Sequence, residues 1–220
     1  ARLTSIPYVV PFVVFVAFMG LRSMLNLSAL TEQIVWFTIM AAVIAIIARP
    51  ALDFRVRQWA GTMAMGLGVF VLWVAPDLLF PGYRGHWLLS NSITGAVAAG
   101  LPESERNNTA VLILRGLRAS LIVPIVEELF WRAWLMRWLI SPAFAKIPLG
   151  TYATQAFWIV AIAFAAEHGP YWDVGLLTGI LYNWWMVRTK SLGDLILAHG
   201  ITNACLSLYV VMAGKWEYWG

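Results

Sequence analysis

Two adjacent carboxylates, Glu127 and Glu128, and one guanidinium, Arg132, lie inside a long apolar stretch of the sequence. A charge at bilayer depth costs about 2.5–3.5 kcal/mol on insertion scales, so ionisable residues within a span indicate a function. On a helix, Glu128 and Arg132 are four residues apart and can pair. Glu127 points about 100° away from Glu128 and has no local partner. We therefore expect Glu127 to meet a partner from another helix.

Polar residues also interrupt two other apolar stretches. His168 ends the segment FAAEH, and Phe164, four residues earlier, can place its ring beneath the imidazole. His199 and Asn203, in the segment HGITN, are also four residues apart and project from one face of a helix. A single histidine in a helix is usually part of the packed core. Three polar segments in one apolar chain instead favour a site shared by four residues: Glu127, His168, His199 and Asn203.

This set of side chains suits hydrolysis of a peptide bond. A carboxylate such as that of Glu127 can take a proton from water, and a histidine can hold that water or transfer the proton. An asparagine amide and an imidazole can stabilise the oxyanion that forms when water attacks a carbonyl group. The Glu128–Arg132 pair would support the site by keeping positive charge nearby, or it would be a purely structural ion pair. The serine-hydrolase and zinc-protease motifs G-x-S-x-G and H-E-x-x-H are absent from the sequence.

A zinc site is the alternative chemistry. Glu127, His168 and His199 could form a His₂Glu ligand set, with water in the fourth position. Such a site needs a further general base, and the spacing already commits Glu128 to its ion pair. Asn203 is a poor zinc ligand but a good amide donor, which suits an oxyanion hole. We therefore expect hydrolysis without a metal or another cofactor.

The composition is that of an integral membrane protein. Of the 220 residues, 61% are hydrophobic and 12% are charged, and the mean hydropathy is +0.75. Soluble domains contain about 25% charged residues, which disfavours a soluble fold. The formal charge of +4 comes from basic residues in short loops between apolar stretches and does not indicate a nucleic-acid partner. Cys205 is the single cysteine, so an intrachain disulfide and a thiol-based zinc site are excluded.

The apolar stretches predict an all-α membrane helix bundle in a single domain, residues 1–220. A span needs about 20 apolar residues, which allows about seven spans in this length. Residues 87–100 are only weakly apolar and are expected to form an interfacial or re-entrant helix. The polar groups described above lie in a core of about 109–213. The expected spans are about 6–25, 32–48, 59–80, 109–140, 151–168, 174–187 and 192–213.

Three motifs in this core resemble those of a known family. EELFWR matches the pattern E-E-x-x-x-R, FAAEH matches F-x-x-x-H and HGITN matches H-x-x-x-N, in this order and on separate spans. The chain therefore resembles the CAAX-protease and bacteriocin-processing (CPBP, or Abi) family of glutamate-dependent intramembrane proteases, in particular its bacterial CAAX-protease-related branch. The resemblance covers about 115–205, and the first hundred residues carry no motif of the family.

The resemblance implies a role for each motif residue. The base, its histidine partner and the two oxyanion donors would be Glu127, His168, His199 and Asn203. The supporting residues would be Glu128, Arg132 and Phe164. The implied substrate is a membrane-anchored protein or peptide in the lipid bilayer, cleaved near its C-terminus and prenylated for the eukaryotic members. Many prokaryotic members process peptides, immunity targets or C-terminal sorting signals instead, and the expected location is a prokaryotic inner or plasma membrane.

Two non-proteolytic functions compete with this interpretation. A non-catalytic membrane scaffold or regulator on the same fold would tolerate loss of Glu127, whereas this sequence retains every motif group. A transporter would need polar residues along a path through the membrane, but here they gather on a few spans without repeated halves. The sequence therefore favours the protease.

Overall fold

Helices make up the fold. The computed structural model describes residues 5–219, and this range contains seven long helical segments and no strand. The predicted all-α membrane bundle is confirmed, although residues 1–4 and 220 of the predicted domain lie outside the described range. The segments are α1 (Ile6–Leu21), α2 (Ala29–Val43) with the π-helical η3 (Ile44–Ala48), α3 (Trp59–Leu79), a long segment over Thr109–Trp138, α7 (Thr154–Ala166), α8 (Trp172–Thr189) and α9 (Leu192–Ala213).

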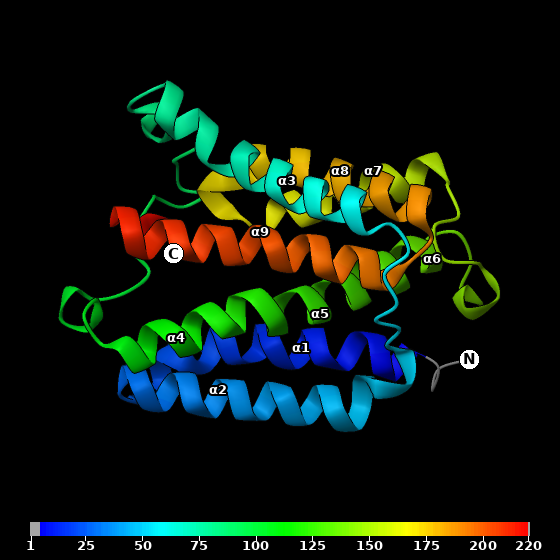
Figure 1. The fold of residues 1–220 in the computed structure, drawn as a ribbon, viewed down its shortest axis with the longest axis horizontal. Coiled ribbons are helices and arrows are strands. Elements are labelled where there is room, and N and C mark those ends of the chain that lie inside the picture. The colour runs from blue at the N-terminus through cyan, green and yellow to red at the C-terminus, as the bar shows by residue number, and fades with distance from the viewer. Residues whose placement is uncertain (1–4, 220) are drawn as a thin grey trace.

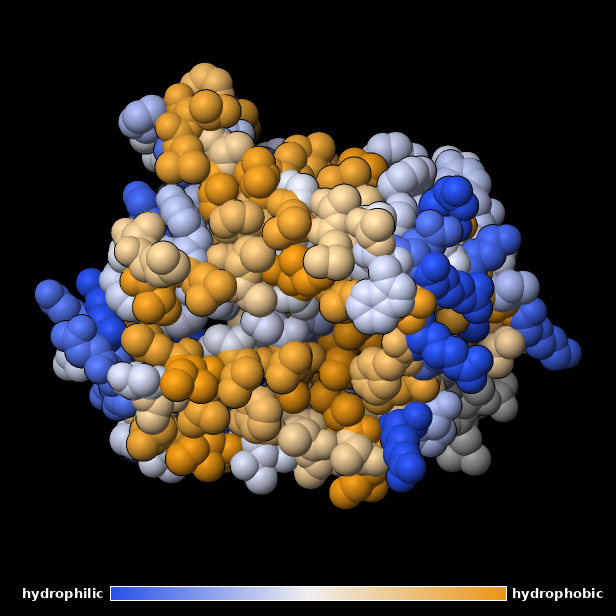
Figure 2. All heavy atoms as spheres, viewed as in Figure 1, coloured by the Kyte–Doolittle hydropathy of each residue, from blue (hydrophilic) through white to orange (hydrophobic). Residues whose placement is uncertain are grey.

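Several of these segments are suited to a bilayer. Four are long and apolar enough to cross a membrane: Ala29–Ala51, Trp59–Leu79, Thr109–Trp138 and Leu192–Ala213. The apolar helices α1 and α7 are shorter. On the face shown in Figure 2, hydrophobic side chains form a broad band across the middle of the molecule, and hydrophilic side chains gather at its two ends. The chain is therefore an integral membrane protein.

The C-terminal helix α9 lies at the centre of the bundle, between α3 and the long segment Thr109–Trp138 (Figure 1). At Gly66 of α3, a Cβ atom would lie 2.6 Å from the carbonyl oxygen of Ala198 on α9. This approach is possible because glycine has no side chain, and small residues commonly allow such close contacts between membrane helices. The helices α7 and α8 pack along each other. Motif residues from three separate segments are thereby brought towards one region.

A carboxylate fixes the start of α3 against α9. The side chain of Asp194 accepts hydrogen bonds from the backbone N–H groups of Arg57 (2.7 Å) and Gln58 (2.9 Å) and from the hydroxyl of Thr62 (2.6 Å). The first N–H groups of a helix have no partner within the helix, and an acidic side chain stabilises that end. Asp194 therefore connects the loop before α3 to the first turn of α9.

The region between α3 and the long segment differs from the prediction. Residues 87–100 form a series of turns with an isolated bridge between Asn91 and Gly95, so the predicted interfacial or re-entrant helix is wrong. The side chain of Asn91 accepts hydrogen bonds from the backbone N–H groups of Ile93 (2.8 Å) and Thr94 (3.1 Å). Gly95 has a φ of +82°, outside the helical region. Asparagine and glycine favour such turns over a helix.

Candidate active site

The segment Thr109–Trp138 changes its winding around the motif EELFWR. It consists of α4 (Thr109–Leu117), the π-helical η7 (Arg118–Ile122), α5 (Val123–Glu128), the π-helical η8 (Leu129–Leu135) and α6 (Met136–Trp138). Pro124, near the start of α5, has no backbone N–H to donate. π-Turns within α-helices are rare and are frequent at functional sites. Both motif glutamates lie on the short α-helical stretch between the two π-helical ones.

Glu128 lies at the centre of a fully buried network. Its Oε1 atom accepts hydrogen bonds from the Nη1 atom of Arg132 at 3.1 Å and from Nδ1 of His199 at 2.9 Å. The ion pair predicted between Glu128 and Arg132 is therefore present. A carboxylate can only accept these bonds, so Nδ1 of His199 carries a proton. The histidine of α9 is held by Glu128 and not by Glu127.

Arg132 extends this network to two further helices. Its Nε atom donates to Oδ1 of Asn183 on α8 at 3.0 Å, and Nδ2 of Asn183 donates to the carbonyl oxygen of Phe157 on α7 at 2.8 Å. The guanidinium group lies 4.3 Å from the ring centre of Phe164. Asn183 was missed in the sequence, although an amide inside the apolar run LYNWW is itself a signal, because buried polar groups need partners.

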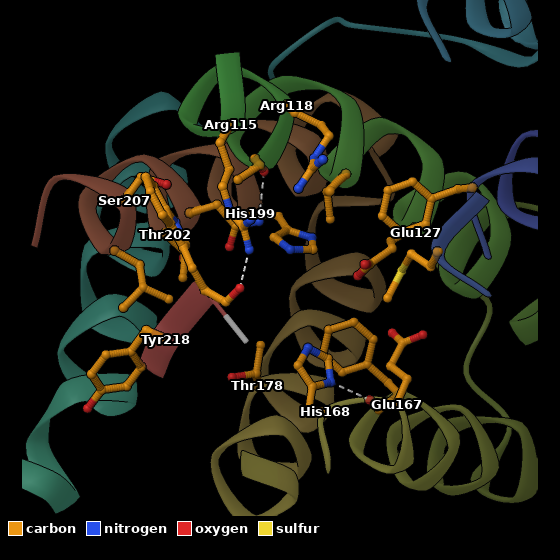
Figure 3. A pocket seen from close by; sticks show the side chains of 18 of the residues that line it. Arg115, Arg118, Glu127, Glu167, His168, Thr178, His199, Thr202, Ser207 and Tyr218 are labelled. Carbon is orange, nitrogen blue, oxygen red and sulfur yellow. Dashed lines mark hydrogen bonds between the residues drawn. The ribbon is translucent and has the colours of Figure 1, made fainter. Parts of the chain in front are cut away.

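Glu127 faces a cavity instead. Its side chain is buried, with 8% of the residue exposed, and its Oε2 atom has no hydrogen-bond partner within residues 5–219. The cavity has a volume of about 430 Å³. Figure 3 shows Glu127, His168 and His199 around this space, and the lining also includes Phe164 and Asn203. The four residues that the sequence assigns to one site therefore line one cavity.

The ring of His168 is fixed by its own helix. Its Nδ1 atom lies 2.6 Å from the carbonyl oxygen of Phe164, and the two ring centres are 4.6 Å apart, as the four-residue spacing predicts. A carbonyl oxygen can only accept, so Nδ1 carries the proton and Nε2 has a free lone pair. The indole of Trp73 lies near the imidazole, at 5.4 Å between ring centres. His168 thus presents an acceptor nitrogen in a defined orientation.

Asn203 and His199 are positioned by polar contacts that cross between helices. The amide Nδ2 of Asn203 donates to the carbonyl oxygen of Ala119, in the π-helical η7, at 2.9 Å. The ring of Tyr182 lies 5.3 Å from that of His199, and its hydroxyl shares a 2.7 Å hydrogen bond with Thr202. Tyr182 and Thr202 could not be singled out from the sequence, because both residue types are common in apolar helices.

Comparison with protein families covers the part of the chain that contains all of these motif residues. Residues 109–205 match the family described as type II CAAX prenyl endopeptidase Rce1-like. This segment is Rce1-like. The family resemblance of the three motifs is thereby confirmed, and the matched family is one of proteases. Among curated proteins and solved structures, none gives a significant match to the chain.

The Rce1-like segment also brings a third carboxylate to the cavity. Glu167 precedes His168, and its Oε1 atom accepts a hydrogen bond from the indole nitrogen of Trp131 at 3.0 Å. It lines the same cavity as Glu127 (Figure 3). Glu167 was not among the predicted site residues, although it directly precedes His168 in FAAEH.

The donor groups of the Rce1-like segment do not form a metal-binding cluster. Within residues 5–219, no three His, Cys, Asp or Glu side chains are grouped closely enough to hold a metal ion. Of the three residues considered for the alternative zinc site, Glu127 faces the cavity, while His168 and His199 each use one ring nitrogen in a hydrogen bond to the protein, as zinc-binding histidines also do. The expected reaction without a metal therefore stays a prediction.

A second polar cluster closes the end of the bundle near the cavity. Arg84 pairs with Asp77 and Asp173, and the hydroxyl of Tyr218 donates to Asp77 at 2.5 Å. Burial raises the pKa of Tyr218, and the hydrogen bond to Asp77 raises it further, so the phenol remains protonated and can donate. This cluster connects the end of α3 to the C-terminal η11 (Trp216–Trp219), two residues of which line the cavity.

Proposed function

We propose that the chain is an intramembrane endopeptidase in which Glu127 activates the hydrolytic water. The observation that carries this proposal is the carboxylate of Glu127, which is buried, lines a cavity and has an oxygen atom without a protein partner. The opposing imidazole of His168 offers a free nitrogen to the same space. A general base must lie within reach of the group that loses the proton, and its own oxygen atom must not be occupied by a strong hydrogen bond or an ion pair. Glu127 fits this requirement, whereas Glu128 is occupied by Arg132 and His199.

The reaction follows from these groups. A water molecule between Glu127 and His168 gives a proton to Glu127, and the resulting hydroxide attacks the carbonyl carbon of the peptide bond. The carbonyl oxygen becomes an oxyanion. Glu127 then passes the proton to the amide nitrogen, the C–N bond breaks, and a carboxylic acid and an amine leave. The chain's own groups account for every proton in this sequence of steps.

Stabilisation of the oxyanion defines the states of His199 and Asn203. The amide of Asn203 has two N–H donors, and one of them is used by Ala119, so the second is available. Because Nδ1 of His199 already donates to Glu128, its Nε2 atom donates to an oxyanion only when the imidazole is charged. In this proposal, Glu128 therefore acts through His199.

The proposal extends to the substrate, the cofactor and the location. The substrate is a membrane-anchored protein or peptide, cleaved near its C-terminus, and the reaction uses no metal. The protein acts in a prokaryotic plasma membrane. The Rce1-like match over 109–205 supports a peptide or protein substrate, and the four helices that can span a membrane support the membrane location.

Product mapping tests the proposed activity. The purified protein is incubated with peptides extracted from host membranes, and new C-termini are identified by mass spectrometry. We expect a defined set of cleaved peptides with the natural chain and none with Glu127→Gln. Identical peptide patterns for both proteins would contradict the proposal and would favour a non-catalytic scaffold.

A further inference from the structure

The cavity that contains Glu127 has a second, basic end. Arg115, in α4, and Arg118, in η7, are three residues apart and therefore lie on one side of the segment. Both are buried, with 6% and 7% of the residue exposed, and both line the cavity. Figure 3 shows their side chains extending from the helix into the space that His199 and Glu127 also face.

These two guanidinium groups have only neutral partners in the described chain. Arg118 donates to the amide oxygen of Gln33 at 2.8 Å and lies 3.8 Å from the ring centre of Trp36. Arg115 donates to the carbonyl oxygen of Trp219. Within residues 5–219, no carboxylate lies within 4.0 Å of either group.

The surroundings do not supply the missing negative charge. Glu32 on α2 attracts both arginines without forming an ion pair, and Arg22, which also lines the cavity, adds a third positive charge. Removing an ion from water without a counter-charge costs several kcal/mol. The hydroxyl of Ser207, on α9, is buried in the same lining without a partner and can donate a further hydrogen bond. This end of the cavity is therefore built to receive an anion.

We propose that Arg115 and Arg118 bind the C-terminal carboxylate of the substrate and thereby fix which peptide bond reaches Glu127. This inference depends on the proposed proteolytic function. Arginine recognises carboxylates through paired N–H donors, and such charge-assisted bonds are about twice as strong as neutral ones. The site would thereby set the number of residues between the cleaved bond and the C-terminus of the substrate.

The spacing along the helix indicates how far this anion site lies from Glu127. Arg118 and Arg115 lie nine and twelve positions before Glu127. At the α-helical rise of 1.5 Å per residue this corresponds to at most about 13 Å and 18 Å along the helix, because the stretch Arg118–Ile122 is π-helical and rises less per residue. An extended peptide covers about 3.3–3.6 Å per residue. The released peptide therefore has at most about four residues if Arg118 holds its carboxylate and at most about five if Arg115 does.

Two other anions could use the same chemistry, namely an acidic side chain of the substrate and a lipid phosphate. A substrate side chain would bind equally well whether the peptide ends in a carboxylate or in a carboxamide. A lipid phosphate would bind in the absence of any peptide. Matched peptides and vesicles of defined composition separate these sources.

The test compares acid and amide forms of one peptide. A peptide that the natural chain cleaves is synthesised with a C-terminal carboxylate and with a carboxamide, and kcat/KM is measured for both. We expect at least a tenfold preference for the acid. In Arg118→Gln this preference should fall below about twofold, and Arg118→Lys should retain part of it. Equal rates for acid and amide in the natural chain would overturn the proposal.

A buried arginine outside the cavity provides the matched control. Arg137 is also 7% exposed and donates to the carbonyl oxygens of Ala133 (2.5 Å) and Ile147 (3.1 Å), but it does not line the cavity. Arg137→Gln should keep the acid preference at its natural value. Loss of the preference in both variants would show a general effect on folding and would count against a specific site at Arg118.

Binding measurements keep this inference distinct from the proposed reaction. Tetrapeptides with an acid or an amide end are titrated against the natural chain in phosphatidylcholine vesicles, and tryptophan fluorescence is recorded. Tighter binding of the acid form, lost in Arg118→Gln, would support the anion site. If no peptide were cleaved in the same preparation, only the proposed proteolytic function would be rejected. Equal binding of both forms, together with thermal stabilisation by phosphatidylglycerol that requires Arg118, would assign the site to lipid phosphate and overturn the proposal.

Discussion

Glu127 and Glu128 are neighbours in the sequence but belong to two different regions of the molecule. Glu127 faces the cavity and has an oxygen atom without a protein partner. About 100° around the helix from Glu127, Glu128 is fully buried, and one of its oxygen atoms accepts hydrogen bonds from both Arg132 and His199. One side of the segment thus contains an uncommitted carboxylate, and the other contains a carboxylate that connects helices.

Within one motif, the reactive carboxylate, Glu127, is therefore distinct from the carboxylate that stabilises the site, Glu128. A group that takes a proton must be free to change its charge, whereas a group that neutralises a buried guanidinium must keep its charge. Two acids on the same face would repel each other and compete for one arginine. The rotation of about 100° between successive helical residues gives each carboxylate its own surroundings.

The largest effect is expected from removal of the cavity-facing carboxylate. Glu127→Gln should lower the rate of peptide cleavage by about 10³-fold, because general-base catalysis contributes about 10²–10⁴-fold. Thermal stability should change little, because Oε2 of Glu127 has no partner to lose. Cleavage is followed by mass spectrometry, and unfolding by differential scanning calorimetry. Glu103→Gln, at an exposed loop position, serves as the control and should retain full activity.

Removal of the other carboxylate should affect both properties. Glu128→Gln leaves Arg132 buried without its counter-charge and His199 without its acceptor, and breaking a buried ion pair costs about 3–5 kcal/mol. We expect a clearly lower unfolding temperature together with loss of cleavage. The comparison would be reversed if Glu128→Gln were inactive but fully stable while Glu127→Gln still cleaved peptides.

A smaller effect is expected from the outer contact of the network. Asn183→Ala leaves Nε of Arg132 without its acceptor and removes the amide donor from the carbonyl of Phe157. A buried polar group that loses its partner costs about 1–3 kcal/mol. The unfolding temperature should therefore fall less than in Glu128→Gln, and part of the activity should remain. An unfolding temperature of Asn183→Ala equal to that of the natural chain would exclude this role for Asn183.

The contrast also shows which features the sequence could predict. Long apolar runs predicted the helices, because a bilayer imposes both length and composition on a span. The spacing of four residues predicted the Glu128–Arg132 pair and the contact of the Phe164 ring with His168, since these depend only on local helical geometry. The three motifs also contain the four residues expected to share a site, Glu127, His168, His199 and Asn203, and all four line the cavity.

Features that depend on packing between helices could not be predicted in this way. The sharing of Glu128 by His199 depends on how closely α9 approaches α5. Asn183 meets Arg132 because of the packing around α8, and the turns at 87–100 depend on hydrogen bonds of Asn91 that a hydropathy pattern does not reveal. The π-helical stretches on both sides of α5 have no sequence signature beyond Pro124.

The smallest effect is expected from removal of metal, for which we predict no change in activity. On the cavity side, Glu127 is the base in the proposed reaction, and a ligating carboxylate could not also take the proton from water. A dication there would lie in a cavity that two buried arginines, Arg115 and Arg118, also line. On the network side, Glu128 is already neutralised by Arg132, so its remaining attraction for a cation is weak. The purified protein should therefore contain much less than one zinc ion per chain, as measured by elemental mass spectrometry. It should also keep its activity after prolonged treatment with EDTA and phenanthroline. One tightly bound zinc ion per chain, with activity lost on its removal and restored on its return, would contradict the roles assigned to the two glutamates. Glu127 would then be a zinc ligand, and Glu128 would become the candidate base.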